Sequence, residues 1–193
     1  MDRREFLQTM TVSAAAATLA ANLGEPAAAD EKPIIKKEEI SMKKIIIAAD
    51  PFAVTLKDAI VADLKEKGYE IVDVGAVPGN DIPYWDGAVA ASKLLQADPA
   101  ARAILFCGTG MGMSLIANRF KGVRASVVES VFAARMCRSI NDSNALCLGS
   151  MIWGDWMAKE AVQAFLNTQF TEGLEGLSDF LHHAAKTVEE ITG

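Results

Sequence analysis

Short apolar runs and longer amphipathic stretches alternate along residues 43–193, and they predict strands and helices in turn. The apolar runs are rich in β-branched side chains, which favour strands. We expect five strands, at residues 44–49, 69–74, 104–106, 122–128 and 145–149. We expect helices at residues 54–67, 84–96, 131–140, 155–167 and 177–191, and one more that follows the central strand and ends at Arg119.

Strands that alternate with helices of this length are typical of a parallel sheet that is covered on both faces. The sequence therefore predicts an α/β fold of three layers, with a five-stranded, parallel, doubly wound (Rossmann-like) sheet between helices. Gly68 is expected to end the first helix, because glycine readily adopts the left-handed conformation of a helix end. Asp155 is expected to cap the start of the helix at residues 155–167.

The first 29 residues have the pattern of an export signal. Arg3 and Arg4 are followed by Phe-Leu, then by an alanine-rich apolar segment and by a small-residue cleavage site that ends at Ala29. This order predicts a twin-arginine signal peptide and a periplasmic protein; the alternative is an alanine-rich helix with a chance arginine pair, in a cytoplasmic protein. Residues 30–42 are charged and predict a linker, so the folded domain spans residues 43–193.

Composition excludes several classes of function. The chain has 193 residues and a net charge of −6 without a basic run, which argues against nucleic acid as the main partner. No apolar stretch approaches the roughly 20 residues of a membrane span. The three cysteines lack metal-ligand spacing and the sequence holds only two histidines, so we expect no metal site.

A glycine-rich turn between the central strand and its helix is the strongest candidate for chemistry. Cys107 ends the apolar run, and Gly108, Gly110 and Gly112 follow it. Ligands of open α/β sheets bind at the carboxyl ends of strands, and glycine lets a ligand approach the backbone closely. A thiol at that place can serve as a base or nucleophile, although cysteine is also a common core residue.

A dinucleotide-binding loop is the alternative for the same turn. Gly108 and Gly110 match the first two glycines of that fingerprint, and Glu129 lies about 20 residues further on, where an acidic residue is wanted. Met113, however, stands in place of the third glycine, which weakens this interpretation.

Several segments together resemble the ribose-5-phosphate isomerase B family, which includes the galactose-6-phosphate isomerase subunits. The resemblance runs from about Lys43 to Phe170. It rests on the segments Ile-Ala-Ala-Asp at 47–50, Cys-Gly-Thr-Gly-Met-Gly-Met-Ser-Leu-Ile-Ala-Asn at 107–118, Lys-Gly-Val-Arg-Ala at 121–125, Asn-Asp-Ser-Asn at 141–144 and Leu-Cys-Leu-Gly at 146–149.

The resemblance implies an aldose–ketose isomerase that needs no cofactor and forms homodimers or homotetramers with sites at a subunit interface. Cys107 would be the base that moves a proton between C2 and C1 of an open-chain sugar. Thr109, with the glycine backbone at positions 108, 110 and 112, would hold the oxyanion of the enediolate. Asp50 and Asn141 would bind sugar hydroxyls, and Asn118 would bind substrate or orient the loop.

The sequence also departs from the family pattern. The family has histidines where this chain has Pro51 and Ile140, and the second histidine is thought to open the sugar ring. A phosphate-binding arginine is replaced by Met151, and the arginines of the tail are absent. Together with an export signal, these changes suggest an unphosphorylated ligand; the alternative is a sugar phosphate that is bound by arginines elsewhere, for which Arg119, Arg124, Arg135 and Arg138 remain. The alternative function is therefore a catalytically altered relative that binds a sugar-like ligand without isomerising it.

Two further sets of residues have a functional and a structural interpretation. Tryptophans at 85, 153 and 156 would line a pocket or belong to the core or an interface. Cys137 and Cys147 would form a disulfide in an oxidising compartment, but a helix cysteine and a strand cysteine are more often separate core residues, which is the prediction here.

Overall fold

A computed structural model describes residues 44–191, so the predicted signal peptide and linker lie outside the described residues. The strands are β1 (Lys44–Ala49), β2 (Glu70–Asp73), β3 (Arg102–Cys107), β4 (Ala125–Val127) and β5 (Ala145–Gly149). The helices are α2 (Val54–Glu66), α3 (Tyr84–Ala97), α4 (Met111–Ala117), α5 (Val131–Asn141), α6 (Asp155–Asn167) and α7 (Ser178–Ile191). Short 3-10 turns follow β1 and precede α7.

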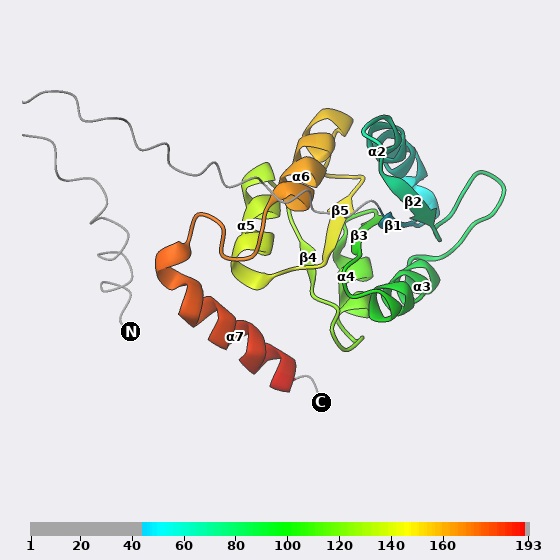
Figure 1. The fold of residues 1–193 in the computed structure, drawn as a ribbon. Helices are drawn as coiled ribbons and strands as arrows, with labels where there is room; N and C mark the ends of the chain where they lie inside the picture. Colours follow the sequence, from blue (N-terminus) through cyan, green and yellow to red (C-terminus); the bar gives the residue numbers. More distant parts are fainter. Residues whose placement is uncertain (1–43, 192–193) are drawn as a thin grey trace, which may run out of the picture. The chain divides into compact units, whose positions relative to one another are not determined.

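All neighbouring strands pair in parallel, in the order β2-β1-β3-β5-β4. Helices α2, α5 and α6 cover one face of the sheet, and α3 and α4 cover the other (Figure 1). The predicted three-layer, doubly wound α/β fold is therefore confirmed. Helix α7 follows α6 in the chain and packs against α5.

The side chains of the central strand β3 alternate between the two cores. Ile104 and Phe106 face α2, α5 and α6, whereas Leu105 and Cys107 face α3 and α4. Leu105, Ile104 and Phe106 are fully buried, because helices cover both faces of the sheet. This alternation fixes the side of the sheet on which the Cys107 thiol lies.

Most predicted elements shift by no more than two residues at their ends, whereas β4 and the cap of α6 differ more clearly. Strand β4 has three residues instead of the seven expected, because the chain before Ala125 is held by asparagine side chains rather than by the sheet. Asp155 is the first residue of α6 and not its cap; the cap is Gly154, which makes no side-chain hydrogen bond. Gly68 has a φ of +83° directly after the first helix, as predicted.

The remaining cysteines and one tryptophan are core residues. Cys137 and Cys147 are buried and free, and burial raises the pKa of both thiols. Trp153 is also buried, and its indole N–H donates to the carbonyl of Val128 at 3.0 Å. Trp85 and Trp156, in contrast, are exposed in the first turns of α3 and α6.

Candidate active site

The turn between β3 and α4 presents the Cys107 thiol to its own backbone. Gly110 adopts a φ of +79°, which is strained for any other residue, and this conformation turns the chain into α4. The Gly110 N–H consequently points back and donates to Sγ of Cys107 at 3.0 Å. Cys107 itself is 5% exposed, so the sulfur lies at the base of the turn and not on the surface.

The same turn passes directly over the end of β5. A Cβ atom at Gly149 would lie 2.6 Å from Cα of Thr109, so only glycine fits beneath the turn. Thr109 is half-buried, and its Oγ1 accepts a hydrogen bond from the N–H of Met111 at 3.4 Å. The hydroxyl of Thr109 therefore lies beside the turn that holds Cys107.

The absence of a side chain at Gly112 is required by helix packing. It lies in the first turn of α4, and a Cβ atom there would be 2.8 Å from the ring of Tyr84 at the start of α3. The missing side chain thus lets α3 and α4 meet at the edge of the sheet. The sequence did not single out Tyr84, although an aromatic residue at the first position of a helix beside the glycine turn is a usable signal.

Asp50 is the polar residue that the structure brings next to Cys107. Ala49 pairs with Phe106 in the sheet, and the N–H of Asp50 donates to the carbonyl of Phe106 at 3.1 Å. Asp50 and Cys107 thus follow paired residues of neighbouring strands, and alternation along β1 directs both side chains to the same face.

The Asp50 carboxyl is buried without full hydrogen bonding. The residue is 7% exposed, and Oδ1 has no partner among the described residues. Burial raises the pKa of Asp50, and the backbone N–H groups of Phe52 and Ala53 offset this only in part. A buried acceptor without a donor is costly, so this oxygen is suited to receive a hydrogen bond from a ligand hydroxyl.

The turn after β5 completes this edge of the sheet. The N–H groups of Ser150 and Met151 donate to the carbonyls of Cys107 and Gly108, at 2.9 and 3.0 Å. Oγ of Ser150 donates to the carbonyl of Phe52 at 3.0 Å. The Met151 side chain covers Gly108, with its Cε 3.3 Å from where a Cβ atom would be. The carboxyl ends of β1, β3 and β5 therefore form one constellation.

Asn118 and Asn141 are not part of this constellation in the same chain. They end α4 and α5, helices that run back from the carboxyl edge to the amino edge of the sheet. Both line a cleft of about 490 Å³ at that opposite edge, together with Ile140 and with residues 184, 185, 188 and 189 of α7. Six of the eight predicted site residues thus meet at one edge, and these two asparagines do not.

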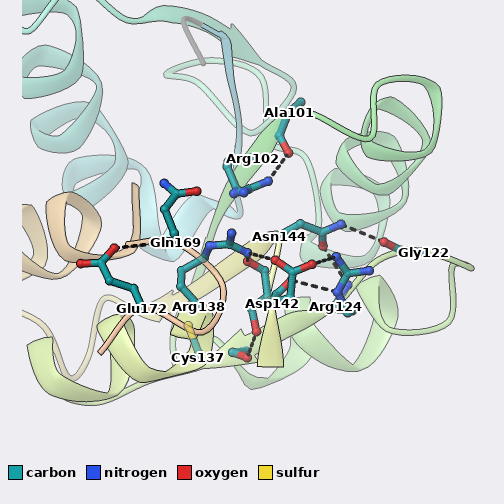
Figure 2. A network of polar contacts seen from close by, with 12 residues as sticks. Ala101, Arg102, Gly122, Arg124, Cys137, Arg138, Asp142, Asn144, Gln169 and Glu172 are labelled. Atoms are coloured by element: carbon teal, nitrogen blue, oxygen red, sulfur yellow. Dashed lines mark hydrogen bonds and ion pairs between the residues drawn. The ribbon is translucent and has the colours of Figure 1, made fainter. Parts of the chain in front are cut away.

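Arg124, one of the arginines named above as an alternative phosphate ligand, also lines this amino-edge cleft. Its Nε donates to the carbonyl of Asp142 at 2.8 Å, and its other nitrogens bind the carboxylates of Asp142 and Glu189 at 2.8 and 2.9 Å. Figure 2 shows Arg124 in a polar network with Asp142, Arg138 and Asn144. The Arg124 guanidinium is consequently already engaged by two carboxylates.

Residues 44–191 present neither a metal site nor a membrane-spanning helix. No group of three or more His, Cys, Asp or Glu side chains is arranged to hold a metal ion there. In the same part of the chain, no helix is both long and apolar enough to cross a membrane.

Comparisons with known proteins find sugar isomerases that are similar to this chain. The family model described as Ribose/Galactose Isomerase matches residues 45–177. A Clostridium protein named 4-deoxy-4-sulfo-D-erythrose isomerase is 41% identical over 150 residues, which are 77% of this chain and 94% of that protein. Ribose-5-phosphate isomerase B of Escherichia coli is 38% identical over 134 residues, 68% of this chain and 89% of its own.

A solved structure shows the same fold. Ribose-5-phosphate isomerase B of Clostridium thermocellum superposes with a TM-score of 0.70 at 32% identity, and the match covers 77% of this chain and 96% of that one.

Proposed function

The chain belongs to the ribose/galactose isomerase family, and on that premise we propose that Cys107 is the base of an aldose–ketose isomerisation of a small sugar. The family assignment makes this protein a sugar isomerase of the intramolecular oxidoreductase type. The single observation that supports the role of Cys107 is its position. Its sulfur is held by the Gly110 N–H at the end of the central strand, on the same face as the unpartnered oxygen of Asp50.

In the proposed reaction, Cys107 as thiolate removes the proton from C2 of the open-chain aldose. The electrons of the broken C–H bond form a C1–C2 double bond, and the carbonyl oxygen on C1 becomes the oxyanion of an enediolate. The Cys107 thiol then returns the proton to C1 and becomes a thiolate again. At the same time the C2 hydroxyl passes its proton to the oxyanion on C1, so that C2 becomes the ketone and C1 carries a hydroxyl group. A positioned base of this kind accounts for a rate gain on the order of 100- to 10,000-fold.

The residues around the thiol have matching roles in this proposal. In this proposal, Thr109 and the backbone N–H groups of its turn stabilise the oxyanion, which is the group that develops charge. Asp50 accepts a hydrogen bond from a sugar hydroxyl through its unpartnered Oδ1. No cofactor takes part, because the proton and the electron pair stay within the sugar and Cys107.

The decisive test is solvent-deuterium exchange at C2 of phosphorylated, sulfonated and free aldoses, catalysed by the purified protein. Cys107→Ala is expected to abolish the exchange, whereas the matched control Cys137→Ala keeps it, because Cys137 is a buried cysteine on the other face of the sheet. Sugar binding without any Cys107-dependent exchange would favour the alternative, a relative that binds a sugar-like ligand and does not isomerise it. The replacement of a family arginine by Met151 is the observation that keeps this alternative open.

We further propose that the active site is completed by a second copy of the chain. Asn141 lies at the amino edge, away from Cys107 of its own chain. The carboxyl edge exposes many large apolar side chains in the turns and first helical turns that follow the strands, which is typical of an interface. They are Phe52, Trp85, Met111, Phe132, Met151, Ile152, Trp156 and Met157.

Mixing two inactive variants tests this arrangement directly. If Cys107 and Asn141 of one site come from different copies, a mixed dimer of Cys107→Ala and Asn141→Ala chains holds one intact site. Equal mixing after unfolding and refolding should then recover about a quarter of the wild-type activity, because half of the dimers are mixed. No recovery from variants that still dimerise would contradict a shared site.

Export remains a proposal that rests on the sequence of residues 1–29. We expect the mature protein in the periplasm, and Arg3→Lys with Arg4→Lys should leave it in the cytoplasm with its signal uncleaved. A cytoplasmic wild-type protein would contradict this localisation.

A further inference from the structure

We propose that the substrate is a sugar that cannot close a ring, namely a four-carbon aldose whose C4 carries a phosphate or sulfonate group. This inference rests on the proposed function, since it identifies which sugars the Cys107 site can use. It is carried by the side chains that surround the site and by the chemistry of ring opening.

Opening a sugar ring needs two proton transfers in addition to the one at C2. The ring oxygen must receive a proton, and the hydroxyl on C1 must lose one, before the carbonyl group exists. An enzyme that accepts cyclic sugars therefore needs an acid–base group near the ring oxygen, apart from the base that acts on the C–H bond.

Of the residues next to Cys107 that are named below, only Asp50 has an acid–base side chain. Pro51, which follows Asp50, has no hydrogen-bonding side chain, and the turn after β5 presents the thioether of Met151 over Gly108. Asp50 is the carboxyl group next to Cys107, and it is assigned here to a sugar hydroxyl.

The surface that a second copy would bring to the site presents an apolar side chain beside Asn141, and the Glu189 carboxylate that lines the same cleft is bound to Arg124 at 2.9 Å. Ile140 stands directly before Asn141, lines the same amino-edge cleft and is 39% exposed, so an apolar side chain would face the sugar there. The two histidines of the sequence lie in α7, away from this position in the chain. His182 bonds to the carbonyl of Ser178 through Nδ1 at 2.8 Å and packs against Phe170, and His183 is not among the residues that line the cleft.

A tetrose with a substituted C4 requires no ring opening. A five-membered sugar ring forms when the C4 hydroxyl attacks C1, and a phosphate on that oxygen, or a sulfonate in its place, removes the nucleophile. Such an aldose stays open and offers C2 directly to Cys107. The 41% identical relative is named for a substrate of this kind, which agrees with the inference without carrying it.

The experiment compares substrates that differ in ring closure alone. Ribose 5-phosphate and 4-deoxyribose 5-phosphate have the same length and the same phosphate, but only the first can cyclise. Deuterium exchange at C2 is measured for both, together with erythrose 4-phosphate and 4-deoxy-4-sulfoerythrose, over a range of enzyme concentrations. The Cys107→Ala variant provides the background rate.

We expect kcat/KM for the open compounds to exceed that for ribose 5-phosphate on the order of 100-fold, the value of a missing acid–base group. With ribose 5-phosphate, the rate should become independent of enzyme concentration, because spontaneous ring opening then limits it. Faster exchange with one of the two tetroses identifies phosphate or sulfonate as the head group.

Two results would count against the inference, and they have different meanings. If ribose 5-phosphate exchanges as fast as its 4-deoxy analogue, in proportion to enzyme concentration, the site opens rings; this inference fails while the Cys107 mechanism stands. If no aldose shows Cys107-dependent exchange, the proposed function fails and the inference fails with it.

Discussion

Asn118 binds Ala125 through both halves of its side-chain amide. Nδ2 donates to the carbonyl of Ala125 and Oδ1 accepts from its N–H, each at 2.8 Å. The side chain therefore pairs with the first residue of β4 as another strand would. Asn144 does the same just upstream, accepting from the N–H of Arg124 and donating to the carbonyl of Gly122, each at 2.8 Å. Together the two asparagines hold the chain that enters β4.

Because of this pairing, we expect Asn118→Ala mainly to lower stability. Loss of two partly exposed hydrogen bonds is expected to lower the free energy of unfolding by about 1–3 kcal/mol. Urea titration followed by circular dichroism measures this, with Ser114→Ala on the same helix as a control for a side chain that bonds only within α4. A variant with wild-type stability but no turnover would instead return Asn118 to the sugar-binding set.

Gly110 and Gly122 offer a matched pair of substitutions. Both have nearly the same positive φ, +79° and +78°, but an added Cβ at Gly110 would lie 3.1 Å from the backbone of Cys147, whereas none of the described atoms is within 4 Å of one at Gly122. Gly122→Ala should thus cost only the left-handed conformation, about 1–2 kcal/mol. Gly110→Ala should cost more and should also displace the N–H that holds the Cys107 sulfur, so that kcat falls.

The measurement is kcat of each variant beside its midpoint of urea unfolding. We expect Gly110→Ala to lose on the order of 10- to 100-fold in kcat, as for a lost oriented contact, and Gly122→Ala to keep it. Equal kcat values for the two variants would show that the Gly110 N–H does not matter for the reaction.

The sequence predicted every strand and the order of helices, because periodicity and β-branched runs report burial on a sheet. It did not predict that β4 is short, since the pairing of Asn118 and Asn144 with backbone depends on contacts between distant segments. The part of the candidate site that lies in one turn could be grouped from the sequence, because Cys107, Thr109 and the glycines lie within six residues. Asp50 joined them through strand pairing, whereas Asn141 could be placed only by the topology, which sends α5 back to the other edge.

We expect the Asp50 carboxylate to lower stability at neutral pH while it supports the reaction. Burial raises its pKa above 3.8, so the native protein holds this proton more tightly than the unfolded chain. Stability therefore falls as pH rises through the raised pKa, and at about pH 7 the charged carboxylate is a cost.

Asp50→Asn removes this cost and should raise Tm at about pH 7, with a gain that shrinks as the pH approaches 4. The same variant should lose about 10- to 100-fold in kcat/KM, because a charged acceptor for the sugar hydroxyl is gone. Thermal scans across pH, next to kinetics, test both halves. A gain in Tm that does not change with pH would contradict the charge argument.

Arg102 and Arg138 lie near one another beside the carboxylate of Asp142, but of these two only Arg138 bonds to it (Figure 2). Arg138 is 2% exposed and donates to Asp142 at 2.7 Å and to the carbonyl of Ser143 at 2.6 Å. Arg102 makes one long bond, 3.4 Å, to the carbonyl of Ala101, and Nε of both arginines is buried without a partner in the described chain. Burial, and then the charge of Arg138, lower the pKa of Arg102 to about 10.

The two arginines should therefore respond in opposite directions to the same substitution. Arg138→Met leaves the Ser143 carbonyl without this donor and weakens the hold on Asp142, and it should lower the free energy of unfolding by about 2–4 kcal/mol. Arg102→Met removes a poorly paired cation and should be neutral or stabilising by up to about 2 kcal/mol. Because the lowered pKa makes wild-type stability rise with pH above about 10, the advantage of Arg102→Met should diminish there. Urea titrations at neutral and alkaline pH test this, and a marked loss of stability in Arg102→Met at neutral pH would show that Arg102 is bound more favourably than its contacts indicate.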